Sequence, residues 1–144
     1  MATSPQEAIE NADIICTATG SVQPVFEDKD VKSGTHISAI GAYTPEMQEL
    51  PIETVARSRI VVDSYATVMD EAGDIVKAIN AGVITQSNIH AELGEIISGR
   101  KPGRNTQHEV TFFKSVGNAV QDATAAQLAL KNAREMKLGI EVEF

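Results

Sequence analysis

Three segments of the sequence combine small and hydroxyl-bearing residues where a run of β-forming residues stops. They are residues 17–21 (TATGS), 39–42 (AIGA) and 114–117 (KSVG). Small side chains let a flat ring approach the backbone, and the free N–H groups at a helix start favour anionic or carbonyl groups. The pattern is typical of a nucleotide-type site, although the same residues also serve the tight strand-to-helix turns of any α/β fold.

The elements that would position these segments alternate between strands and helices. Strands are predicted over residues 13–19, 36–41, 59–64 and 109–114, with a strand-like end at 140–144. Helices are predicted over 5–12 with Ser4 as N-cap, 52–56, 65–81 with a break at Gly73, 91–98 and 118–137. This alternation predicts an α/β fold, with a mostly parallel sheet and helices on both faces. Ligands of such sheets bind at the carboxyl ends of the strands, where the three segments lie.

Several single residues have plain structural interpretations. Cys16 lies in an apolar run and is expected to be a buried small hydrophobe. Lys114 either faces a phosphate or is a solvated strand end. Asp63 is interpreted as a cap or turn residue. We expect a solvated acidic helix face at Asp70, Glu71 and Asp74, and core positions at Phe112 and Phe113.

Composition and charge exclude several classes of function. The chain has 144 residues, of which 42% are hydrophobic and 22% charged, and this suits a single domain. Its net charge of −8, with no offsetting Lys/Arg cluster, makes nucleic acid and anionic membranes poor partners. No apolar run is long enough to span a bilayer, and the first residues do not have the pattern of a signal peptide. We therefore expect a cytoplasmic protein.

Motifs that would indicate other chemistry are missing from the sequence. No G-x-G-x-x-G pattern follows a strand, and the nearest glycine-rich match, residues 94–99, falls at the end of a predicted helix. The three histidines, His36, His90 and His108, are far apart and lack metal-ligand spacing, so we expect no metal site. There is no G-x-S-x-G nucleophile elbow.

Three longer segments resemble signatures of the ornithine cyclodeaminase/mu-crystallin family. They are residues 37–50 (ISAIGAYTPEMQEL), 91–104 (AELGEIISGRKPGR) and 110–122 (VTFFKSVGNAVQD). They stand in the family's order, and the resemblance runs from about residue 4 to about residue 138.

This resemblance implies an activity and an assembly. Members of the family are homodimers that bind NAD(H) or NADP(H) and act on small amino or imino acids, and they are more than twice as long as this chain. By that comparison, residues 1–144 form one partial dinucleotide-binding domain without the first Rossmann strands and the glycine-rich loop. We therefore expect the nicotinamide side of an NAD(P)-dependent oxidoreductase or cyclodeaminase, inactive by itself and binding cofactor weakly or not at all. The alternative is a non-catalytic binding module like mu-crystallin.

The resemblance also assigns expected roles to single positions. Val116 matches a residue beside the substrate. Tyr43 stands where cyclodeaminases have their catalytic Asp, and Met47 stands where they have a Lys near the cofactor. Both changes remove a charge, which argues against ornithine cyclisation; Tyr43 is either a proton donor or a rim aromatic that packs on the ligand. Cofactor contacts are expected at Thr17, Ile40, Gly41, Ala42 and Ser115.

Overall fold

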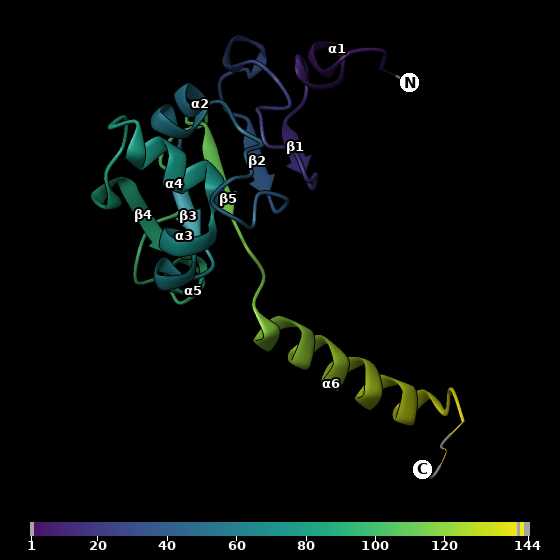
Figure 1. The fold of residues 1–144 in the computed structure, drawn as a ribbon. Helices are drawn as coiled ribbons and strands as arrows, with labels where there is room; N and C mark the ends of the chain where they lie inside the picture. Colours follow the sequence, from purple (N-terminus) through teal and green to yellow (C-terminus); the bar gives the residue numbers. More distant parts are fainter. Residues whose placement is uncertain (1, 141, 143–144) are drawn as a thin grey trace.

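The computed structural model describes residues 2–140 and 142, and these contain one five-stranded sheet (Figure 1). Every neighbouring pair of strands is parallel, and the order across the sheet is β1-β2-β5-β3-β4. The predicted parallel α/β fold is therefore confirmed. The strands are β1 (Ile14–Thr17), β2 (His36–Ala39), β3 (Arg59–Val62), β4 (Ile89–Glu92) and β5 (Thr111–Lys114).

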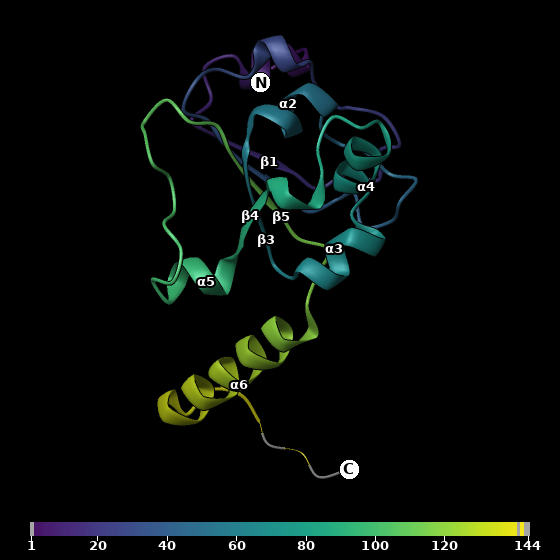
Figure 2. The same ribbon diagram turned by 90° about the vertical axis from the view of Figure 1, so that its left-hand side faces the viewer.

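Helices lie on both sides of this sheet. Figure 2 shows α4 on one side of the strands and α5 on the other. The helix predicted after Ser4 is present, and the Ser4 hydroxyl caps it by accepting the amide of Glu7 at 3.2 Å. The helices are α1 (Pro5–Ile9), α2 (Ile52–Arg57), α3 (Tyr65–Glu71), α4 (Gly73–Asn80), α5 (Leu93–Ile97) and α6 (Ala119–Met136), with short 3-10 helices at η1 (Asp28–Asp30) and η2 (Gln86–Asn88).

The predicted break at Gly73 is confirmed. Between α3 and α4, Ala72 is extended, with φ −77° and ψ 94°. A Cβ atom on Gly73 would overlap the carbonyl oxygens of Thr44 and Met47, so the loop after β2 packs directly on the start of α4. Only glycine allows this approach, and the approach fixes α4 against the carboxyl end of the sheet.

The helix predicted over residues 91–98 is wrong in its first part. Residues 89–92 form β4, in which Ile89 and Ala91 are buried and His90 and Glu92 are half-buried. Only residues 93–97 are helical. The side chain of Glu95 accepts the backbone amide of Glu92 at 3.0 Å, so the helix starts only after the strand has ended.

One face of the sheet forms the hydrophobic core. Alternate strand residues on this face, including Ile15, Ile37, Ile60 and Phe112, are buried and pack with the apolar residues of the covering helices. The expected core position of Phe112 is confirmed, whereas Phe113 points to the other face and is half-buried. The period-two alternation of strands thus separates the two phenylalanines.

The outer face of the sheet is largely open at β1. Ile14 is 65% exposed and Cys16 is also exposed, so the predicted burial of Cys16 is wrong. The residues of β1 alternate between exposed and buried, so only one of its faces is covered. β1 is also an edge strand of the described sheet, because only β2 pairs with it.

The long helix α6 stands apart from the sheet (Figure 1). Asn118 caps its start by accepting the amide of Val120 at 3.1 Å, and none of the helical residues is buried. Lys137 ends the helix in the left-handed conformation, with φ 55°. Of the strand predicted at residues 140–144, Ile140 and Val142 are in irregular structure, and 141, 143 and 144 lie outside the described residues.

Candidate functional site

The three strand ends singled out from the sequence meet at one edge of the sheet. Thr17, Ala39 and Lys114 are direct cross-strand neighbours, because β2 pairs with β1 on one side and with β5 on the other. The chain then continues past each strand through residues 17–21, 40–43 and 115–117. We call these three segments together the carboxyl edge. The structure therefore brings together the segments that the sequence proposed for a ligand site.

Gly41 brings the ends of β1 and β2 into direct contact. A Cβ atom at this position would overlap the backbone of Thr19 and the carboxylate of Glu49, so no other residue fits without a shift. Ala42, the next residue, is fully buried, while Ile40 is 49% exposed. In the strip from residue 40 to residue 42, Ile40 is therefore the exposed side chain, while Gly41 and Ala42 pack against the protein.

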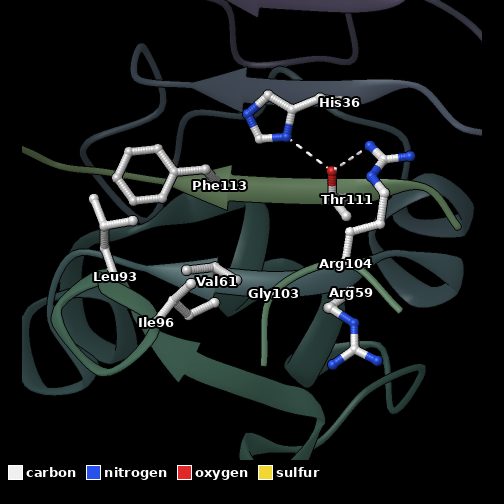
Figure 3. Close-up of a pocket in the computed structure, with 9 residues that line it drawn as sticks. All are labelled: His36, Arg59, Val61, Leu93, Ile96, Gly103, Arg104, Thr111 and Phe113. Atoms are coloured by element: carbon white, nitrogen blue, oxygen red, sulfur yellow. Dashed lines mark hydrogen bonds between the residues drawn. The ribbon is translucent and has the colours of Figure 1, made fainter. Parts of the chain in front are cut away.

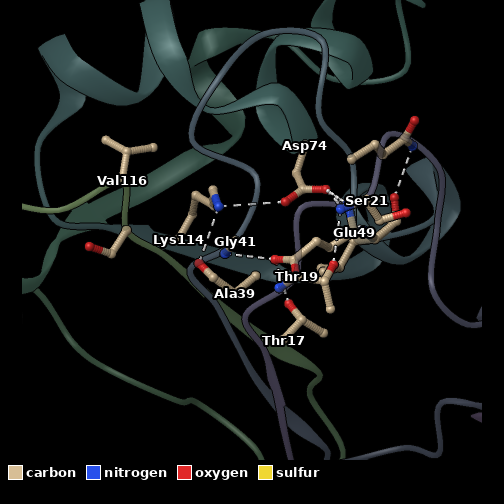
Figure 4. Close-up of polar contacts among 12 residues, drawn as sticks. Thr17, Thr19, Ser21, Ala39, Gly41, Glu49, Asp74, Lys114 and Val116 are labelled. Carbon is tan, nitrogen blue, oxygen red and sulfur yellow. Dashed lines mark hydrogen bonds and ion pairs between the residues drawn. The ribbon is translucent and has the colours of Figure 1, made fainter.

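A buried carboxylate, Glu49, lies directly beneath this strip (Figure 4). It accepts three hydrogen bonds, from the hydroxyl of Thr17 at 2.9 Å, the amide of Thr19 at 2.5 Å and the amide of Gly41 at 2.8 Å. Burial by itself would raise the pKa of Glu49, but these donors together hold it below its ordinary value. Glu49 is thus a buried, ionised acceptor shared by three donors. One of them is the hydroxyl of Thr17, a residue that was expected to contact the cofactor.

Behind Glu49 lies a buried ion pair between Asp74 and Lys114. Both side chains are fully buried, and Lys114 Nζ lies 3.7 Å from Asp74 Oδ2. Asp74 Oδ1 accepts the backbone amides of Glu49 at 2.7 Å and Leu50 at 2.9 Å, and Lys114 Nζ donates to the carbonyl of Ala39 at 3.3 Å. Burial raises the pKa of Asp74 and lowers that of Lys114, so each group depends on the other to keep its charge.

These positions correct two interpretations made from the sequence. Lys114 neither faces a phosphate nor is solvated, because it shares the inner face of β5 with Phe112. Asp70 and Glu71 are exposed as expected. Asp74 is not part of a solvated acidic face, because it is buried in the first turn of α4, one turn before the buried Ala78. Strand and helix periodicity indicated burial for both residues. We expected them at the surface because their side chains are charged.

A second carboxylate organises the end of β5. Asp63 Oδ2 accepts the hydroxyl of Ser115 at 2.7 Å and the amide of Val116 at 3.2 Å, and its Oδ1 accepts the amide of Ser64 at 2.8 Å. The Ser115 hydroxyl in turn accepts the amide of Gly117 at 3.1 Å. Asp63 is therefore a turn residue, as the sequence suggested, and it fixes Ser115 and Val116 at the carboxyl edge.

The side chain of Tyr43 lies on the open side of the same edge. It is 53% exposed, and its backbone amide donates to the carbonyl of Gly41 at 3.0 Å in a tight turn. Met47 is half-buried, and its amide closes the next turn by donating to the carbonyl of Thr44 at 3.1 Å. Tyr43 is therefore an exposed residue directly after the strip 40–42, and Met47 lies in the following turn.

A separate pocket of about 420 Å³ lies on the outer face of the sheet (Figure 3). Its apolar part includes Val61 and Phe113, and its polar part includes two arginines. Arg59 pairs with Glu109 at 2.8 Å, and Arg104 donates to the carbonyls of Gly34 and Glu109 and to the Thr111 hydroxyl. Because both guanidinium groups already have protein partners, the pocket does not offer a ready anion site.

Within residues 2–140 and 142, no group of three or more His, Cys, Asp or Glu side chains is arranged to hold a metal ion. Nor does any helix in this range combine the length and the apolar composition that crossing a bilayer requires.

Comparison with known proteins gives consistent matches. The sequence profile of the ornithine cyclodeaminase/mu-crystallin family matches residues 1–137. A Δ1-pyrroline-2-carboxylate reductase of Bacillus cereus is 46% identical over 143 residues, which are 99% of this chain and 44% of that protein.

Solved structures of reductases and dehydrogenases also match this chain. The Δ1-pyrroline-2-carboxylate reductase of Thermococcus litoralis, in complex with NADH and L-proline, superposes with a TM-score of 0.91 at 43% identity, over 98% of this chain and 44% of that one. An archaeal alanine dehydrogenase dimer with bound NAD has a TM-score of 0.82 at 38% identity, over 94% of this chain and 43% of that one. The chain thus spans less than half the length of these relatives.

Proposed function

Because the chain belongs to the ornithine cyclodeaminase/mu-crystallin family, we propose that it forms the nicotinamide side of an NAD(P)-dependent oxidoreductase for small amino or imino acids. The observation that carries this proposal is the carboxyl edge, where the close contact at Gly41 holds the ends of β1 and β2 together beside the end of β5. The likeness to a reductase in complex with NADH and L-proline supports a nicotinamide cofactor.

The residues present fit one end of the cofactor. A Cβ atom added to Gly20 or Gly117 would meet nothing within 4 Å, so the chain is open at these two positions of the carboxyl edge. Bound NAD(P)H supplies the hydride for reduction of an imine carbon. In this proposal, residues 40–42 and Ser115 line the ring, with Thr17 behind them through its hydrogen bond to Glu49, and Val116 lies beside the substrate.

The chain offers little to hold the other end of the cofactor. No G-x-G-x-x-G loop follows a strand in it, and in dinucleotide-binding folds the amides of that loop hold the pyrophosphate. We therefore propose that this chain by itself binds NAD(H) or NADP(H) weakly or not at all. A homodimeric assembly and a cytoplasmic location belong to the same proposal.

The side chain of Tyr43 has two possible roles in this site. Its hydroxyl can donate a proton to the reduced substrate, or its ring can pack on the ligand at the rim. Neither Tyr43 nor Met47 carries a carboxylate or an ammonium, so we propose reduction of a cyclic imino acid rather than cyclisation of ornithine.

A chimera tests this function. The chain is joined to the part of the Thermococcus litoralis reductase that precedes the matching region, and oxidation of NADH is followed with Δ1-pyrroline-2-carboxylate. We expect reduction by the chimera, none by this chain alone, and no release of ammonia from ornithine. A correctly folded chimera without reductase activity would contradict the proposal.

Two variants of the chimera divide the roles at the site. Gly41→Ala should abolish reduction, because its Cβ overlaps the backbone of Thr19. Loss of reduction in Tyr43→Phe would identify Tyr43 as a proton donor, whereas unchanged reduction would leave it the packing role.

A further inference from the structure

We propose that Glu49 is a positioning residue of the carboxyl edge, and that its ionised carboxylate sets the spacing between the ends of β1 and β2 where the nicotinamide ring would lie. The consequence for the ring rests on the function proposed above. Glu49 does not itself reach that side of the edge, because its side chain is fully buried. It acts through the backbone of the two segments that it holds.

The geometry of the three donors supports this role. Glu49 Oε1 accepts the Thr19 amide, and Oε2 accepts both the Gly41 amide and the Thr17 hydroxyl. Among the described residues, Glu49 is the only acceptor recorded for either of the two amides. Beyond the pair Thr17–Ala39, the amide of Ile40 still donates to the carbonyl of Thr17 at 2.9 Å, and after this bond the Glu49 side chain links Thr19 to Gly41.

A neutral amide of the same shape cannot replace this carboxylate. Glutamine has one acceptor oxygen and one donor NH₂ group, whereas both oxygens of Glu49 receive a backbone N–H. In either orientation, the NH₂ group of Glu49→Gln would face the amide of Thr19 or that of Gly41. Two donors facing each other in a buried site repel, so the two segments would have to separate.

The backbone of Glu49 is anchored independently of its side chain. Asp74, at the start of α4, accepts the amides of Glu49 and Leu50 and pairs with Lys114 at the end of β5. These are the two titratable groups that face Glu49, one from α4 and one from β5. The carboxylate is thus presented from a fixed backbone, and the spacing that it sets is tied to the middle of the sheet.

Asp63 provides an internal comparison. It holds the amide of Val116 at the end of β5 in a similar way, but it makes no recorded contact with Thr19 or Gly41. If Glu49 acts on β1 and β2 in particular, Glu49→Gln should disturb Thr19 and Gly41 and spare Val116. Asp63→Asn should have the reverse effect.

Amide hydrogen exchange on the full chain, without cofactor, tests the positioning itself. In Glu49→Gln, exchange at Thr19 and Gly41 should accelerate about ten- to a hundredfold, the range expected for loss of a hydrogen bond to a charged acceptor. The core amide of Phe112 should keep its rate. Glu46→Gln is the matched control, since Glu46 is an exposed carboxylate in the same loop, and it should change neither amide. Unchanged exchange at Thr19 and Gly41 in a folded Glu49→Gln would overturn the proposal.

The wild-type chain gives a second measurement if Glu49→Gln does not fold. As the pH falls, protonation of Glu49 should shift the amide proton signals of Thr19 and Gly41 together, with one midpoint below the ordinary carboxyl range, as the lowered pKa of Glu49 requires. The Val116 signal should not follow that midpoint. Two separate midpoints, or no change at either amide, would overturn the proposal.

Titration with NADH separates this inference from the proposed function. If NADH shifts the signals of residues 40–42 in the wild type, Glu49→Gln should weaken that response at least about fivefold. This factor is the lower end of the range typical of coupled sites. An equal response in the variant would refute the link between Glu49 and the ring site. No response at these residues in the wild type would agree with a chain that does not bind the cofactor by itself, and the exchange result would then decide whether Glu49 positions the edge.

Discussion

The buried pair Asp74–Lys114 allows a stability prediction with a defined size. Asp74→Asn keeps an oxygen that can accept the amides of Glu49 and Leu50, but it places an NH₂ group 3.7 Å from the ammonium of Lys114. Lys114 then keeps only the carbonyl of Ala39, at 3.3 Å. The substitution therefore removes the charge partner and spares the backbone hydrogen bonds.

The expected loss of stability is large for a single substitution. Leaving one member of a buried ion pair without its partner costs about 3–5 kcal/mol. At about 2–4 °C per kcal/mol for a domain somewhat larger than this one, the melting temperature should fall by about 6–20 °C. Domains are commonly stable by about 5–15 kcal/mol, so the variant should still fold, with a reduced margin.

Urea unfolding followed by circular dichroism measures this loss. Lys114→Met removes the cation, and the double variant Asp74→Asn/Lys114→Met replaces the pair by neutral groups, so the double variant should lose less than the sum of the two single losses. Glu71→Gln is the control, because Glu71 is an exposed carboxylate at the end of α3, two residues before α4. Strictly additive losses, or a loss in Asp74→Asn below about 1 kcal/mol, would refute the argument that the two charges depend on each other.

Three further predictions follow from the exposed and the titrating residues. Cys16 is exposed, so its thiol in the folded chain should react with a disulfide reagent at a rate within about tenfold of that of free cysteine. Strong protection of the thiol would mean that another copy of the chain covers this face of β1. If the chain forms a dimer through the open edge of β1, Ile14→Lys should give monomers in light scattering. Val120→Lys on α6 should not, since both residues are exposed but only Ile14 lies on that edge. A dimer that survives Ile14→Lys excludes the edge as the interface. The lowered pKa of Glu49 contributes stability that is present above the unfolded carboxyl pKa and is lost as the pH falls through the folded pKa. The melting temperature of Glu49→Gln should therefore fall less steeply than that of the wild type as the pH is lowered. An equally steep fall would contradict this.

The order of elements and the place of the site could be predicted because they depend on local signals. Apolar runs and glycines located four of the five strands in the described residues, and the small residues after three of these strands marked the carboxyl edge. The strand β4 was missed because its four residues run directly into the Glu-rich start of α5. Its alternation of Ile89 and Ala91 with polar residues was the signal that could have found it.

The buried charges could not be predicted from residue type alone. Lysine and aspartate are rarely fully buried, so Lys114 and Asp74 were expected at the surface. Their partners come from segments far apart in the chain, and Glu49 lies 32 residues from Thr17, with which it shares a hydrogen bond. The same limit applies to Cys16, because the sequence of β1 does not indicate which of its faces will be covered.

Titration of the isotope-labelled chain with NADH, followed residue by residue by NMR, tests most directly the claim that the carboxyl edge is the nicotinamide side of a cofactor site. We expect shifts confined to residues 40–43 and 115–117, with a dissociation constant no tighter than about 1 mM, which corresponds to about 4 kcal/mol of binding. The amides that border the outer pocket, such as Val61 and Thr111, should not respond. Micromolar binding by this chain, or shifts centred on the outer pocket, would contradict the account.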